Sequence, residues 1–166
     1  MPKITANGKR IKRAISEAFI ALLQKTPFKK ITVQNILDKA EVHRATFYHY
    51  YFDKYDLAKS IIDHLAEEFI EAVESPGSGS HSIYTYIEKN ADALQAVFSI
   101  HSPDFDTSAE SVDSFCKVYR QRAGNDGAET MFAALFYAYI MRIGLISSPY
   151  SLKSLPPIAS FSPPPA

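Results

Sequence analysis

The stretch TVQNILDKAEVHRATFYHYYFDK, residues 32–54, predicts two short helices joined by a tight turn. We expect the first helix over residues 33–40, behind Thr32, whose hydroxyl can accept a hydrogen bond from a free N–H group of the first turn. The apolar residues of this helix share one face: Val33, Ile36, Leu37 and Ala40. Glu41 and Val42 interrupt the spacing, so the turn is expected there.

The second helix is predicted to begin near His43 or Arg44 and to expose a polar face. Phe47 points inward, and the outward positions are His43, Arg44, Thr46, Tyr48 and His49. An arginine at the start of such a helix can donate a bidentate pair of hydrogen bonds to guanine. Thr46 or Tyr48 can contact a thymine methyl group or a phosphate. This face therefore predicts contact with DNA, and the alternative is a set of ordinary surface residues.

The segment TFYHYYFDKYDL, from Thr46 to Leu57, resembles the threonine, aromatic, tyrosine, aromatic and lysine signature of TetR-family transcriptional regulators. The match extends from about Ile11 to Ile62, roughly a third of the chain. The resemblance implies an all-α fold, with an N-terminal three-helix helix-turn-helix domain joined by a long helix to a small helical ligand and dimerisation domain. It also implies a phosphate contact by Lys54, near the start of the long helix. The predicted DNA-binding residues are Thr32, His43, Arg44, Ala45, Thr46, Tyr48, His49 and Lys54.

Two positions differ from the family pattern, one in the turn and one at the start of the second helix. Glu41 stands where the family usually has glycine, and a left-handed backbone there costs a non-glycine residue about 1 kcal/mol. His43 stands where the family usually has serine or threonine, which are better N-caps. We therefore expect a strained turn and a weakly capped second helix.

The charge of the chain is divided between its two ends, although the formal net charge is zero. Residues 1–60 hold 12 Lys and Arg against 5 Asp and Glu, a net of +7. Residues 61–166 hold 6 against 13, a net of −7. This division suits a protein that binds DNA phosphates with its N-terminal part only. An ordinary solvated charged face is the alternative.

An amphipathic helix is predicted ahead of the two-helix unit, with its apolar side covering that unit. Its apolar residues are Ile11, Ala14, Ile15, Ala18, Phe19, Leu22 and Leu23. Basic residues crowd its first turns and the loop after Pro27, where they can reach phosphates beside a groove. Such contacts set affinity and salt dependence without reading sequence. The phosphate-contact candidates are Lys9, Arg10, Lys12, Arg13, Lys29 and Lys30.

A long helix is predicted from its N-cap Asp53 to about Val73, and it carries two apolar rows. One row is Leu57, Ile61, Leu65 and Phe69, and the other is Ala58, Ile62, Ala66 and Ile70. Two rows imply burial on two sides. This helix is therefore expected to connect the N-terminal domain to the rest of the chain.

The sequence after the long helix falls into segments of different amino-acid composition. Residues 75–80, SPGSGS, predict a linker, and further helices are expected at 82–101, 108–123 and 127–147. Thr107 with Glu110 has the spacing of a capping box. We predict a DNA-binding domain at 1–56, called the head, a helical regulatory and dimerisation domain at 57–148, called the body, and a Pro-rich tail at 149–166.

The helix expected at 127–147 is apolar nearly all round, so most of its circumference must be covered. TetR-family proteins form a four-helix bundle across a two-fold axis, which predicts a homodimer here. Six of the ten prolines lie in the 18 residues of the tail, which we expect to be extended or disordered. Family members commonly end with a further helix, and this sequence shows none.

Aromatic residues after the linker can line an inducer pocket or fill an ordinary core, and both interpretations stay open. The pocket candidates are Phe98, His101, Phe105, Phe115, Tyr119, Phe132 and Phe136. Cys116, on an apolar face with Val112, Phe115 and Tyr119, is interpreted as a buried inert thiol rather than a redox sensor. A single cysteine permits no intrachain disulfide, and with no apolar N-terminal signal a cytoplasmic location is expected.

These observations predict a DNA-binding transcriptional regulator, a repressor that binds a palindromic operator in double-stranded DNA as a dimer, with a small-molecule inducer as one hypothesis. No catalytic residue, cofactor, metal or membrane contact is predicted. One alternative is an adaptor with the same head, whose body binds a partner protein. The other is a metal-dependent enzyme using His101, Asp104 and Asp106. Glycine-rich phosphate loops, nucleophile elbows and zinc spacings are absent from the sequence.

Overall fold

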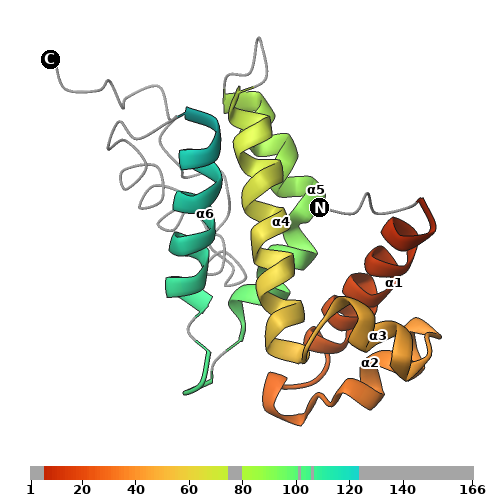
Figure 1. Cartoon of the computed structure of the whole chain (residues 1–166). Helices are drawn as coiled ribbons and strands as arrows, with labels where there is room; N and C mark the ends of the chain where they lie inside the picture. Colours follow the sequence, from red (N-terminus) through yellow and green to blue (C-terminus); the bar gives the residue numbers. More distant parts are fainter. Residues whose placement is uncertain (1–5, 75–79, 101, 106, 124–166) are drawn as a thin grey trace, which may run out of the picture.

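The computed structural model describes residues 6–74, 80–100, 102–105 and 107–123 of the chain. The helices are α1 (Ala6–Leu23), α2 (Val33–Ala40), α3 (Arg44–Tyr50), α4 (Lys54–Glu74), α5 (Ser80–Phe98) and α6 (Thr107–Ala123), with a 3-10 helix η1 (Phe28–Lys30). Figure 1 shows α1, α2 and α3 at one end of α4, with α5 and α6 beside its remaining length. The described residues contain helices and no strand, which confirms the predicted all-α class.

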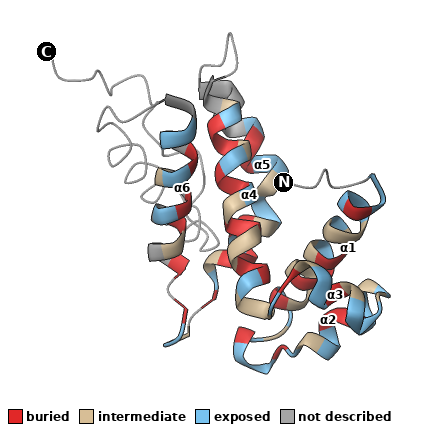
Figure 2. Cartoon of the chain, in the orientation of Figure 1, coloured by how far each residue is buried: buried red, intermediate tan, exposed pale blue. Residues whose placement is uncertain are grey.

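The head is built on the apolar side of α1, as the spacing predicted. Ile15, Ala18, Phe19 and Leu23 are buried there, and α1 contacts both α2 and α5. Phe19 meets Phe28 of η1 edge to face, with 6.2 Å between the ring centroids. Figure 2 shows the buried residues of α1 to α3 on the sides that face one another.

The start of α2 carries a capping box. The backbone N–H of Asn35 donates to Oγ1 of Thr32 over 3.2 Å, and the backbone N–H of Thr32 donates to Oδ1 of Asn35 over 2.9 Å. Two otherwise unpaired donors are satisfied in this way. The predicted cap by Thr32 is confirmed, and Asn35 is the partner that the sequence analysis did not assign.

The connecting helix α4 begins with a second side-chain cap. Oδ1 of Asp53 accepts from the backbone N–H groups of Tyr55 and Asp56, both over 2.8 Å. Both predicted apolar rows are buried, from Leu57 and Ala58 at one end to Phe69 and Ile70 at the other. The helix therefore packs on two sides, against the head at its start and against α5 and α6 along its length.

The two helices of the body attach to α4 by different chemistry. On α5, the hydroxyl of Tyr86 donates to the carbonyl oxygen of Leu65 over 2.8 Å, and its ring meets Phe69 edge to face. Burial raises the pKa of Tyr86 well above its ordinary value. On α6, the side chain of Ser114 is fully buried and donates to Asp63 of α4.

The α4–α6 contact is extended by charged and hydroxyl groups. Lys59 forms an ion pair with Glu110, and its Nζ lies 3.7 Å from a carboxylate oxygen of Asp113. Helix α6 starts one residue earlier than predicted, because Thr107 is its first residue and donates its hydroxyl to the Ile100 carbonyl oxygen over 3.2 Å. Buried apolar side chains from α1 through α6 form one connected cluster.

Several predicted segments lie outside the described residues. They are the helix at 127–147, the tail at 149–166 and most of the linker at 75–80. The division of the chain into domains at 56 and 148 stays a prediction. Among the helices that the structure describes, none is long and apolar enough to cross a membrane.

Candidate nucleic-acid interface

The turn between α2 and α3 is set by a left-handed residue. Glu41 has φ 54° and ψ 43°, and it is the only non-glycine residue with positive φ in the described part of the chain. The backbone N–H groups of Glu41 and Val42 both donate to the carbonyl oxygen of Leu37. The expected left-handed turn is therefore confirmed, and it lets α3 change direction directly after α2.

Helix α3 starts at Arg44 behind the N-cap residue His43. The carbonyl oxygen of His43 accepts from the backbone N–H groups of Thr46 and Phe47, over 2.9 and 3.2 Å. Within the described structure, the imidazole of His43 makes no capping hydrogen bond. The helix thus starts without a side-chain cap, as the departure from serine or threonine led us to expect.

Phe47 fixes the orientation of α3. Its side chain is fully buried, and its ring contacts Tyr51, with 5.6 Å between the centroids. The opposite side of the helix is exposed at His43, Arg44, Ala45, Tyr48 and His49, whereas Thr46 is half-buried. The predicted outward face exists with that one difference.

Arg44 and Tyr48 form a pair on the exposed face. Nη2 of Arg44 lies 3.3 Å from the Tyr48 hydroxyl, to which it donates, and the guanidinium carbon lies 5.3 Å from the ring centroid. A guanidinium has five N–H donors in a planar arrangement, so this contact uses one of them. The pair holds a planar group with several further donors on the surface of α3.

The six basic phosphate-contact candidates differ in their surroundings. Lys9, Arg10, Arg13, Lys29 and Lys30 are exposed. Lys12 is half-buried, with its Nζ 5.6 Å from the ring centroid of Tyr50 and 5.7 Å from that of Tyr51. Nε of Arg13 lies 2.7 Å from a carboxylate oxygen of Glu17, and this hydrogen bond raises the pKa of Arg13. Part of the positive charge of α1 is therefore balanced within the helix.

Lys54 points into the protein. Its Nζ donates to the carbonyl oxygens of Phe28 and Ile31, each over 2.9 Å, and lies 4.4 Å from the centroid of the Phe28 ring. Burial lowers the pKa of Lys54. These contacts join the start of α4 to η1 and to Ile31 directly after it. A phosphate contact by this lysine stays a prediction.

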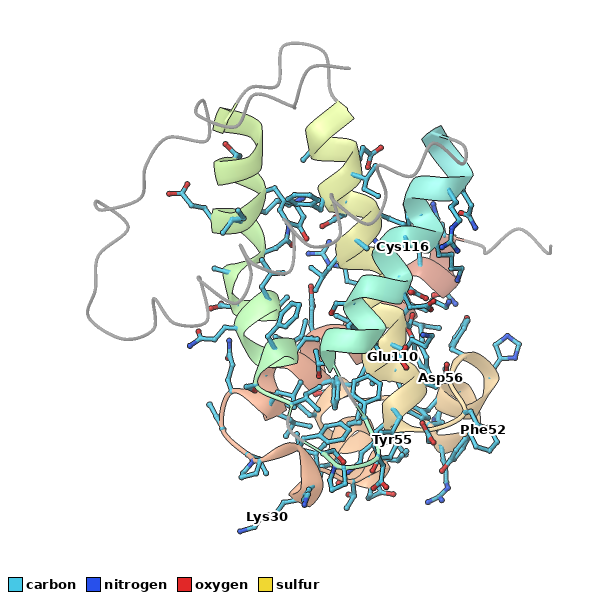
Figure 3. The ribbon with its side chains drawn as sticks, turned by 90° about the vertical axis from the view of Figure 1, so that its left-hand side faces the viewer. Lys30, Phe52, Tyr55, Asp56, Glu110 and Cys116 are labelled. Carbon is cyan, nitrogen blue, oxygen red and sulfur yellow. The ribbon has the colours of Figure 1, made fainter. Side chains whose placement is uncertain are left out.

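The turn between α3 and α4 contains two features that the sequence analysis did not assign. Phe52 is 83% exposed, and its backbone N–H donates to Oδ2 of Asp56 over 2.9 Å. The Asp56 side chain thus reaches back to Phe52, the residue before Asp53. The Asp-x-x-Asp spacing of residues 53 and 56 could have indicated this hydrogen bond. Figure 3 shows Phe52 extending away from the ribbon beside Asp56, with Lys30 also at this end of the molecule.

The pocket candidates are only partly described. Phe105 is buried in the turn before α6, where it stacks on Phe28 with 6.3 Å between centroids and contacts Tyr55 at 6.0 Å. Phe98 is half-buried against the core. The other candidates, His101, Phe132, Phe136 and the side chains of Phe115 and Tyr119, lie outside the description. Phe105 therefore joins the body to the head.

The metal hypothesis and the cysteine concern the same part of the body. Asp104 is exposed, whereas His101 and Asp106 lie outside the described residues. No group of three His, Cys, Asp or Glu able to hold a metal ion occurs among the residues that the structure describes. The side chain of Cys116 is half-buried, where full burial was expected.

The described residues thus define an all-α protein with a helix–turn–helix unit whose second helix exposes a polar face. Over 53 residues the chain is 36% identical to an uncharacterized HTH-type transcriptional regulator, YxbF, of Bacillus subtilis (strain 168). This stretch is 32% of the chain and spans only 14% of the length of that relative. No family model matches the chain. No solved structure matches it significantly.

Proposed function

We propose that the chain is a DNA-binding transcriptional regulator of the TetR type, in which α3 enters the major groove. The observation that carries this proposal is the exposed face of α3, with Arg44 and Tyr48 paired on it behind the left-handed turn at Glu41. A helix presented in this way fits the major groove, which is wide enough to admit one.

Charge and similarity support the same function. The head holds most of the basic residues of the chain, and five of the six phosphate candidates are exposed. A cationic surface of this kind binds the DNA backbone with an affinity that falls as salt rises. The relative YxbF is named as an HTH-type transcriptional regulator, which agrees with this assignment.

Within this function the residues of α3 take distinct roles. Arg44 reads guanine through its remaining donors, with Tyr48 holding its guanidinium in place. His49 and Ala45, also exposed, line the groove beside them. Residues of α1 and of the loop around η1 contact phosphates and set the register of the protein on the duplex.

The regulator acts as a dimeric repressor that binds a palindromic operator and is released by a small-molecule inducer. This part rests on the resemblance of residues 46–57 to the TetR signature and on the apolar sequence at 127–147. Two heads related by a two-fold axis bind half-sites about one helical turn apart, so the operator is an inverted repeat.

The test is selection of bound duplexes from a random pool, followed by affinity measurements with the selected sequence and with unrelated DNA. We expect an inverted repeat, and we expect Arg44→Ala to weaken binding of that repeat by about 1 to 3 kcal/mol more than binding of unrelated DNA. Equal losses on both duplexes would assign Arg44 to the backbone. Absence of any salt-dependent DNA binding by the wild type would refute the function.

A further inference from the structure

Phe52 is the most exposed large apolar side chain in the described part of the protein. Phe52 is 83% exposed, and Tyr48 of α3, at 46%, is the other exposed large apolar residue among those that the structure describes. A single exposed apolar residue is common on protein surfaces and carries no meaning alone. The position of Phe52 and its fixed backbone are what distinguish it.

The backbone on both sides of Phe52 is held. Tyr51 ends α3 in an extended conformation, with φ −138° and ψ 136°, and its side chain is buried against Phe47. The N–H of Phe52 donates to Asp56, and Asp53 caps α4. Since successive side chains of an extended segment point in opposite directions, burial of Tyr51 directs Phe52 outward. Its exposure is therefore built into the turn.

The position of Phe52 beside α3 indicates which kind of partner its side chain contacts. Phe52 lies in the turn directly after α3, two residues beyond the last helical residue, so it borders the C-terminal end of the helix that exposes Arg44 and Tyr48. Protein docking sites usually gather several large apolar residues, whereas Tyr48 and Phe52 are the exposed large apolar residues among those described and belong to a head that is basic overall, although Asp53 and Asp56 lie beside Phe52. The backbone that borders a groove of a DNA duplex presents apolar surface through the carbon atoms of its deoxyriboses.

We propose that Phe52 packs against the deoxyribose carbons of the DNA strand bordering the groove that α3 occupies. This inference rests on the proposed function, and it adds an apolar contact that the charged residues of the head do not supply. Because the sugar is the same at every nucleotide, the contact raises affinity without changing sequence preference. Because no charge is involved, it releases no counterions and leaves the salt dependence unchanged.

The experiment compares full-length wild type, Phe52→Ser and Phe52→Leu on a mixed-sequence duplex of about 30 base pairs, three helical turns, over a series of salt concentrations. We expect Phe52→Ser to lose about five- to tenfold in affinity, as for partial burial of a phenylalanine, at every salt concentration. The slope of log affinity against log salt should stay the same. Phe52→Leu, which keeps an apolar side chain, should stay within about twofold of wild type.

The thermal melting curves of both variants should match that of the wild type, because the side chain contributes little to the folded core. Wild-type affinity in Phe52→Ser would overturn the proposed contact between Phe52 and the DNA sugars. A smaller salt slope in Phe52→Ser would also overturn it, because the side chain would then be acting through neighbouring charges. If the wild type itself shows no salt-dependent binding, the proposed function fails. If the wild type binds and Phe52→Ser binds equally well, only the Phe52 contact fails, so the two failures are distinguishable.

Discussion

At the scale of single residues, Lys54 contacts two residues that precede it by 26 and 23 positions in the sequence, Phe28 and Ile31. Its ammonium donates to the carbonyl oxygens of Phe28, the first residue of η1, and of Ile31, directly after η1. The charge lies over the ring of Phe28. We infer that this lysine positions the loop bearing Lys29 and Lys30 relative to α4.

Replacing this lysine tests the positioning role against the phosphate role. Lys54→Met should lower the free energy of unfolding by about 1 to 3 kcal/mol, because two carbonyl oxygens lose a charged donor. The salt slope of DNA binding should stay unchanged. The measurements are urea unfolding and affinity over a salt series. Lys30→Met is the matched control, since that exposed side chain should reduce the salt slope by about one and leave stability intact. A stable Lys54→Met with a reduced slope would make Lys54 a phosphate contact.

Some residue contacts followed from sequence and others did not. The caps by Thr32 and Asp53 depend on neighbours within three or four positions, so spacing predicted them. The left-handed Glu41 was expected from the family resemblance, because the family usually has glycine at that position. The partners of Lys54 and the ring contacts of Lys12 join distant segments. Local periodicity carries no information about such pairs, because they are created only when the helices pack.

At the scale of elements, α4 shows where a hydrophobic pattern predicts burial, and α6 shows buried residues that such a pattern does not find. Both apolar rows of α4 are buried as predicted. On α6 we considered the apolar face that includes Cys116 and did not predict burial of Thr107, Ser111 and Ser114. All three are buried, and Ser114 forms a hydrogen bond to Asp63 of α4. Small hydroxyl side chains let two helices approach closely and satisfy their own hydrogen bonds, so a search for apolar residues overlooks them.

This small-residue contact predicts sensitivity to size. Ser114→Leu should destabilise the protein by about 1 to 3 kcal/mol. The larger side chain has no space between α6 and α4, and removal of the serine hydroxyl leaves Asp63 without that donor. Ser114→Ala, the control, should cost only about 1 kcal/mol. Urea unfolding measures both. A leucine variant at least as stable as the alanine variant would show that the two helices are not closely packed at this position.

At the scale of the whole molecule, one connected core runs from α1 through α4 into α5 and α6. The ring of Phe105 in the body packs against Phe28 and Tyr55 at the base of the head. Lys59 of α4 is paired with Glu110 of α6. A change in the position of α6 therefore affects residues that also contact α4 and the head.

The oligomeric state is tested through the predicted helix at 127–147. Its sequence is apolar on nearly every side, so a symmetric contact between two copies is expected to cover it. Phe136→Glu and Ile140→Glu should each dissociate the dimer, because a buried unpaired charge costs several kcal/mol and occurs twice across a two-fold axis. Affinity for the inverted repeat should fall with dissociation, since one head binds one half-site. Sedimentation velocity measures the dissociation, with circular dichroism to verify folding and with Glu88→Gln, exposed on α5, as the control. Folded glutamate variants that still sediment as dimers would move the interface elsewhere, with the exposed side of α5 as the next surface to change.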